Sequence, residues 1–166
     1  MAFSPDGSAL AYQIGPGAVR RRDFSSVIEE VVSLSLNPGD ALGAMFWDST
    51  ALWAVVDRLN GGVRARNTET GAEVVIAPFE FGKRVRLVTW APGGRRLALW
   101  EEFCVAAPSG TPCQVETATL FLVDRDTGAR TEVARGAAPG GPVAIAPDGT
   151  GIVYGFGGEL YRASLP

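Results

Sequence analysis

The sequence predicts an all-β fold, a β-propeller of about four blades, and three observations support this. A short turn motif of the Pro-Asp-Gly type precedes an apolar run several times in the 166 residues. A leucine or isoleucine of that run recurs at positions 10, 52, 97 and 152, at spacings of 42, 45 and 55 residues. A second motif, ending in Thr-Gly, recurs in phase with the first. Spacings near 40–45 residues are typical of four-stranded propeller blades.

The turn motif marks the start of each unit. Its copies are Phe3-Ser4-Pro5-Asp6-Gly7, Trp90-Ala91-Pro92-Gly93-Gly94 and Ile145-Ala146-Pro147-Asp148-Gly149. A worn copy lies between Met45 and Ala54, where Trp47-Asp48-Ser49 replaces the proline turn. The glycines at 7, 94 and 149 are expected to supply the positive φ that such a turn needs.

The runs after the turns predict the second strand of each blade, over residues 9–13, 51–56, 96–100 and 151–155. Their continuous apolar character indicates strands that are covered on both faces. Third strands are expected at 62–66 and 120–123. The hairpin motifs 67–72 and 124–129 then lead to fourth strands at 73–77 and 130–134, and a further fourth strand is expected at 28–36.

The predicted blades are residues 1–41, 42–84, 85–140 and 141–166, within one domain. The last blade ends after its third strand, so we expect a partial ring. This is interpreted as a piece of a longer propeller. A homodimer forming an eight-bladed ring and a self-closed ring of four blades are the alternatives, because an open arc exposes apolar faces and an unpaired strand edge.

These motifs resemble those of the PD40 or TolB-type WD40-like β-propeller repeat family. The resemblance implies a non-catalytic platform that binds a protein or peptide, often at the bacterial cell envelope. Similar repeats precede the hydrolase domain of prolyl-oligopeptidase-type serine peptidases, so the propeller portion of such an enzyme is an alternative. A sensory propeller that binds a small ligand is another.

Composition narrows the function further. The chain has no histidine, which excludes Ser-His-Asp and Cys-His catalysis within it. Neither a Gly-x-Ser-x-Gly elbow nor a phosphate-binding loop is present. A net charge of −3 gives no electrostatic footprint for nucleic acid, and no apolar run approaches the roughly 18 residues of a membrane-spanning helix. We therefore expect no enzyme activity, no cofactor, no nucleic-acid partner and no membrane insertion.

Candidate binding residues lie in the longer loops, on the face opposite the turn motifs. The segments 78–84 and 101–118 are expected to be such loops. They hold aromatic side chains beside charges of both signs, which suits a protein or peptide contact. The candidates are Phe79, Phe81, Arg84, Trp100 and Phe103. The competing interpretation is that the three phenylalanines fill gaps between blades.

Cys104 and Cys113 lie in a segment of loop composition and are expected to form a local disulfide. Such a bridge would favour a periplasmic or extracellular location, and free thiols would favour the cytoplasm. Two charged runs are interpreted as structural. Arg20-Arg21-Arg22 is expected to be a solvated edge paired with Asp23 or Glu29. The run 124–126 lacks the third acidic ligand of a calcium loop, so no metal site is expected.

Overall fold

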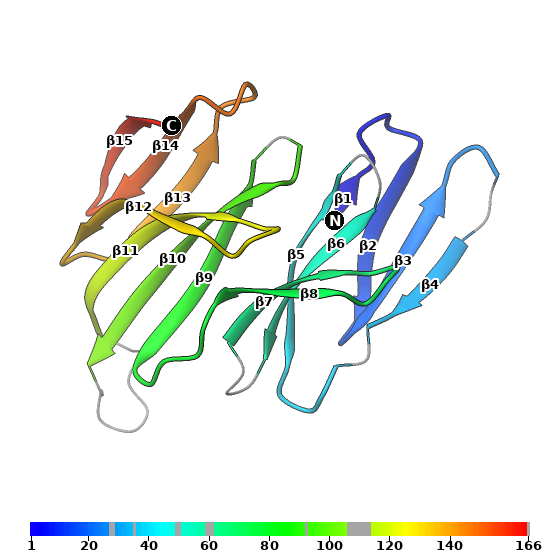
Figure 1. The fold of residues 1–166 in the computed structure, drawn as a ribbon, viewed down its shortest axis with the longest axis horizontal. Helices are drawn as coiled ribbons and strands as arrows, with labels where there is room; N and C mark the ends of the chain where they lie inside the picture. Colours follow the sequence, from blue (N-terminus) through cyan, green and yellow to red (C-terminus); the bar gives the residue numbers. More distant parts are fainter. Residues whose placement is uncertain are drawn as a thin grey trace. The chain divides into compact units, whose positions relative to one another are not determined.

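The computed structural model describes residues 1–26, 29–34, 36–48, 51–58, 62–91, 93–105 and 114–165. These residues form four antiparallel sheets and no helix, which confirms the predicted all-β fold (Figure 1). The described residues include no helix long and apolar enough to cross a membrane. The chain divides into two compact units, Met1–Pro78 and Phe79–Pro166, and each is described by itself.

Unit 1 holds two four-stranded sheets in which the strands follow chain order. The first is formed by β1 (Ala2–Phe3), β2 (Ala9–Gly15), β3 (Ala18–Asp23) and β4 (Glu29–Ser33). The second is formed by β5 (Ala41–Trp47), β6 (Leu52–Arg58), β7 (Gly62–Asn67) and β8 (Glu73–Ala77). Such up-and-down sheets are the blades of a propeller.

Unit 2 holds a four-stranded and a three-stranded sheet, again in chain order. The first is formed by β9 (Lys83–Trp90), β10 (Arg96–Val105), β11 (Gln114–Asp124) and β12 (Arg130–Gly136). The second is formed by β13 (Gly140–Ile145), β14 (Gly151–Phe156) and β15 (Glu159–Ser164). The short last sheet agrees with the strand count made from the sequence, and β15 is an exposed edge strand.

Each unit buries an apolar core between its two sheets, because the second strands carry apolar residues on both faces. In unit 1 the core residues include Ala11, Val19, Trp47, Leu52 and Ala54. In unit 2 they include Ala98, Trp100, Ala118, Leu120 and Ile152. The cores explain why the predicted second strands are the most regular part of the repeat.

The turn motif behaves as predicted. Gly7, Gly94 and Gly149 have φ of 71°, 69° and 72°. Each donates its N–H to the carbonyl three residues earlier, over 2.8–3.0 Å. In the worn copy the carboxylate of Asp48 accepts the N–H of Ala51 at 2.7 Å and the indole N–H of Trp53 at 2.8 Å. Ser49 lies outside the described residues.

The Thr-Gly hairpins are built alike. Asn67 Oδ1 accepts the N–H groups of residues 69 and 70, and Asp124 Oδ1 accepts those of residues 126 and 127. Asp124 therefore caps a hairpin. The turn after β3 begins in a similar way without the Thr-Gly pair: Asp23 Oδ1 accepts the N–H of Ser25 at 2.8 Å.

Two sequence-based boundaries need correction. The sequence predicts a loop over residues 101–118, but residues 101–105 and 114–118 are strand. They extend the β10–β11 hairpin from the pair Glu101↔Thr119 to the pair Val105↔Gln114. The β-branched residues in this stretch favour strand over loop. The fourth strand of the first blade ends at Ser33 and not at residue 36 as expected. Cys113 lies outside the described residues. Cys104 is disulfide-bonded, and its pairing with Cys113 stays a prediction.

Candidate functional site

A fully buried carboxylate lies in unit 2, beside the first residues of β9. Glu102, in β10, has no solvent exposure. Its register partner on β9 is Arg84, and Trp100 is paired with Arg86. Paired residues in antiparallel strands project from the same face, so both arginines share the face of Glu102. This face packs on the last sheet.

The carboxylate of Glu102 is held by both arginines and by the backbone. Arg84 donates from Nε over 3.1 Å and from Nη2 to Oε2. Arg86 Nη2 lies 3.4 Å from Oε1 and also donates to the carbonyl of Gly140. The N–H of Gly140 donates to Oε1 over 3.3 Å. A buried carboxylate is tolerated only with such cationic and hydrogen-bonding partners. We call Arg84, Arg86, Glu102 and Gly140 the Glu102 cluster.

The two arginines remain open to solvent although Glu102 does not. The side chains of Arg84 and Arg86 are 55% and 47% exposed. Two guanidinium groups face one carboxylate, so the cluster carries a net charge of +1. Each arginine has five N–H donors, and Glu102 and Gly140 use only some of them. The solvent side of the cluster therefore presents cationic donors.

Glu101 points to the opposite face of β10, as the alternation of a strand requires. Its carboxylate lies 2.6 Å from Arg130 Nη2 and 3.7 Å from Lys83 Nζ. The two neighbouring glutamates thus have separate partners on separate faces. Their arrangement is that of two structural ion-pair groups and not of an acid/base pair acting on one substrate.

Trp100, a predicted binding residue, lies in the core. It is fully buried, stacks on Phe156 with ring centroids 5.7 Å apart, and donates from Nε1 to the carbonyl of Gly141 over 3.0 Å. The sequence places Trp100 at the end of a predicted strand, beside an expected loop, because it underestimates the length of β10. We therefore leave Trp100 out of any contact surface.

The three predicted phenylalanines are exposed, with Phe79 at 52%, Phe81 at 91% and Phe103 at 39%. Phe103 lies over Gly82, where a Cβ would come within 3.1 Å of its ring. The N–H of Cys104 bonds the carbonyl of Gly82 over 2.8 Å, which ties this segment to β10. We call Phe79, Phe81 and Phe103 the aromatic rim. Phe103 projects from the face of β10 opposite to Glu102, so Arg84 and Phe103 leave the sheet on different sides.

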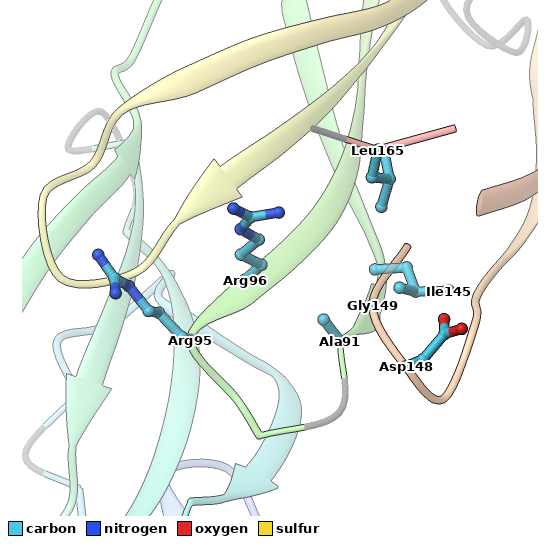
Figure 2. Close-up of a pocket in the computed structure, with 7 residues that line it drawn as sticks. All are labelled: Ala91, Arg95, Arg96, Ile145, Asp148, Gly149 and Leu165. Carbon is cyan, nitrogen blue, oxygen red and sulfur yellow. The ribbon is translucent and has the colours of Figure 1, made fainter. Parts of the chain in front are cut away.

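The opposite end of unit 2 has a pocket of about 240 Å³ between two turn motifs. Figure 2 shows Arg95 and Arg96 on one side of it and Asp148 on the other, with Leu165 nearby. Its charged groups already have partners. Arg95 Nε donates to Asp124 over 2.8 Å, and Asp148 accepts the N–H of Thr150, a hydrogen bond that lowers the pKa of Asp148.

A similar pocket of about 370 Å³ lies between the turns of unit 1. There the guanidinium of Arg21 lies 4.8 Å above the Trp47 ring and 3.6 Å from Glu69. Arg20 and Arg22 pair with Glu29, which is one of the two partners predicted for the arginine triplet. Since these charges are already paired, the turn pockets are the weaker candidates.

Sequence reasoning found Arg84 but missed Arg86, Glu102 and Gly140 as its companions. A signal was present: basic residues at 84 and 86 alternate along a strand, opposite an acidic pair at 101 and 102. The strand pairing that brings them together was not specified by local pattern, because it depends on how far β10 extends.

Comparison with solved structures supports the propeller fold. The chain superposes on a putative TolB from Agrobacterium tumefaciens with a TM-score of 0.64 and 14% identity, covering 98% of this chain and 56% of that one. The oligogalacturonate lyase from Vibrio parahaemolyticus superposes with a TM-score of 0.67 and 17% identity, covering 95% of this chain and 45% of the lyase. A prolyl endopeptidase superposes with a TM-score of 0.60 and 16% identity, covering 99% of this chain and 26% of the endopeptidase.

These identities show a shared fold and nothing finer. The chain spans about half or less of the length of these structures. A scan against protein families finds no match, and a search of curated protein sequences finds none. Both enzymes and a TolB protein are among the similar structures, so the fold alone does not decide between catalysis and binding.

Proposed function

We propose that the chain is a non-catalytic propeller module of the PD40 or TolB type that binds a protein or peptide partner. The observation that carries this proposal is the aromatic rim at the start of β9. Phe81 is 91% exposed, and Phe79 is half exposed two residues away. Aromatic side chains, phenylalanine included, are enriched in protein interfaces relative to the rest of the surface.

The rigidity of the rim adds to the proposal. Phe103 belongs to β10, and Gly82, which follows Phe81 in the chain, is bonded to Cys104 of the same strand. Lys83, the first residue of β9, forms an ion pair with Glu80 between the two phenylalanines. A preorganised surface loses less conformational entropy on binding than a free loop does.

Further blades or a second copy of the chain are proposed as additional partners. The edge of β15 leaves backbone N–H and C=O groups open to another strand, and Leu160 on it is 74% exposed. Light scattering coupled to gel filtration tests the second copy. A monomer at all concentrations would argue against it and leave the aromatic rim untouched.

The test of the rim is a loss-of-binding experiment with a matched control. The variant Phe79→Ser/Phe81→Ser and the variant Phe24→Ser are each used as bait in extracts of the native host, with the wild-type chain alongside. Phe24 is 50% exposed and belongs to unit 1, so it is not a member of the rim. We expect the rim variant alone to lose specific partners, as measured by quantitative mass spectrometry. Equal recovery by all three baits would contradict the proposal.

A second candidate is the propeller portion of a prolyl-oligopeptidase-type serine peptidase. Its support is the superposition on a prolyl endopeptidase over nearly the whole chain. In that case the chain itself remains inactive, and the gene that encodes it also encodes an α/β-hydrolase domain. Reading the adjoining coding sequence distinguishes the candidates. Hydrolysis of a chromogenic prolyl peptide by the purified chain would contradict both forms of the proposal.

A further inference from the structure

We propose that Arg84 and Arg86, held by the buried carboxylate of Glu102, form a binding site for a carboxylate group of a peptide ligand. This inference rests on the proposed function and specifies a ligand chemistry for the residues that follow Phe81 in the chain. The group is either the C-terminal carboxylate of the peptide or an acidic side chain, since the two share one chemistry.

The charge balance of the Glu102 cluster is the first argument. One arginine would be sufficient to neutralise Glu102, yet two contact its carboxylate oxygens. The surplus positive charge lies on two arginines whose side chains are about half exposed, while the Glu102 side chain is wholly buried. A monoanion at the solvent side would bring the cluster to neutrality.

The unused donors are the second argument. Arg84 spends Nε and Nη2 on Glu102, and Arg86 spends Nη2 on Glu102 and Gly140. In the described part of the chain, no hydrogen bond is made by Arg84 Nη1 or by Arg86 Nε and Nη1. Guanidinium groups with free N–H pairs match the planar carboxylate and bind it in a bidentate manner.

The fixed position of these donors is the third argument. Both arginines project from β9 in register with β10, and Gly140 on β13 contacts Arg86 and Glu102 at once. The buried glutamate therefore orients the arginines before any ligand arrives. Ligating groups that are held by a supporting layer of this kind bind with a smaller entropic cost.

The surroundings favour a peptide over an isolated anion. Phe81 is three residues before Arg84, which is at most about 10 Å along an extended chain. A peptide with an apolar residue near its carboxylate can reach both groups. The single surplus charge of the cluster matches a carboxylate better than a phosphate dianion.

The experiment uses three short peptides and the full chain labelled with ¹⁵N. The peptides are N-acetyl-Gly-Phe-Gly with a free C-terminal carboxylate, the same peptide as its C-terminal amide, and N-acetyl-Gly-Phe-Glu amide. We expect the two carboxylate-bearing peptides to shift the signals of Arg86 Nε–H and Gly140 N–H, and the neutral amide to bind at least about tenfold more weakly. A stronger effect of one carboxylate peptide identifies the source of the group.

Variants separate binding from folding. Arg86→Gln is expected to weaken the carboxylate peptides about tenfold or more. Arg84→Lys keeps the charge and loses the planar fork of the guanidinium, so its affinity for the carboxylate peptides is expected to fall by an intermediate factor. Arg135→Gln is the matched control, because Arg135 is 61% exposed and pairs with Glu132 elsewhere in the unit. If Arg86→Gln unfolds, Glu102→Gln/Arg86→Gln removes the unpaired charge and repeats the measurement.

Three results would overturn the inference. These are equal binding of the neutral amide, unchanged binding by the folded arginine variants, and tighter binding of inorganic phosphate than of the carboxylate peptides. None of them depends on the aromatic rim. Loss of native partners by Phe79→Ser/Phe81→Ser together with a negative peptide titration would leave the proposed function standing and remove only the carboxylate site.

Discussion

The indole of Trp100 occupies the space that a side chain on residue 140 would fill. A Cβ on Gly140 would overlap Cγ, Cδ2 and Cε2 of the indole, and the backbone carbonyl of the next glycine accepts the indole N–H. Gly136 lies at the same interface, and a Cβ on it would collide with the Phe156 ring. The last two sheets approach closely because these residues lack side chains.

Gly140→Ala is therefore expected to destabilise the protein by about 3 kcal/mol through overpacking against Trp100. Urea unfolding followed by tryptophan fluorescence measures the change. The control is Gly15→Ala, since a Cβ on Gly15 meets no atom within 4 Å and its φ is not positive. A Gly140→Ala variant as stable as the control would show that the sheets do not pack as described.

Asp124→Ala is expected to cost about 1 kcal/mol, because the β11–β12 hairpin loses the acceptor for the N–H groups of Asp126 and Thr127. Asp124→Asn should be much milder, since Asn67 has this role in the equivalent hairpin. The asparagine variant gives up chiefly an exposed ion pair with Arg95, worth a few tenths of a kcal/mol. Chemical denaturation of the two variants compares them, and equal losses would refute the capping role.

The pKa of Asp6 is lowered from 3.8 to about 2, first by the hydroxyl of Ser4 and then by the N–H and hydroxyl of Ser8. Because the folded pKa is the lower one, the stabilisation by this turn is complete above pH 3.8 and is lost as the pH falls through about 2. A pH titration of the Asp6 carboxyl carbon by NMR measures the value directly.

Ser4→Ala should move the pKa of Asp6 upward, whereas Ser25→Ala should leave it unchanged because Ser25 binds Asp23 instead. A native Asp6 that titrates near 3.8 would contradict the hydrogen bonding of this turn.

The predicted bridge between Cys104 and Cys113 should stabilise the oxidised chain by roughly 2–3 kcal/mol through loop closure. Thermal unfolding with and without dithiothreitol is expected to show a lower melting temperature under reducing conditions. Cys104→Ser is the control, because it should melt at the lower temperature and ignore the reductant. Identical melting of the wild-type chain in both conditions would speak against the bridge.

The fold was predictable because the sequence of each blade contains local turn and strand motifs. The turn at Gly7, the hairpin at Asn67 and the apolar run before Trp100 depend on residues close in sequence. The Glu102 cluster was not predictable in this way. Its members lie 18 and 38 residues apart, and they meet only because β10 continues past residue 100 and β13 packs on it. Burial of Trp100 escaped prediction for the same reason.

The two adjacent glutamates of β10 also lock the alignment of β9. A one-residue slip between these strands would turn Arg84 and Arg86 to the other face of the sheet and separate them from the buried carboxylate of Glu102. The register of a strand is specified only weakly by burial when both of its faces are apolar, as they are in β10 before Glu101. The ion pairs of Glu101 and Glu102 therefore favour the observed register of β9 over its one-residue neighbours.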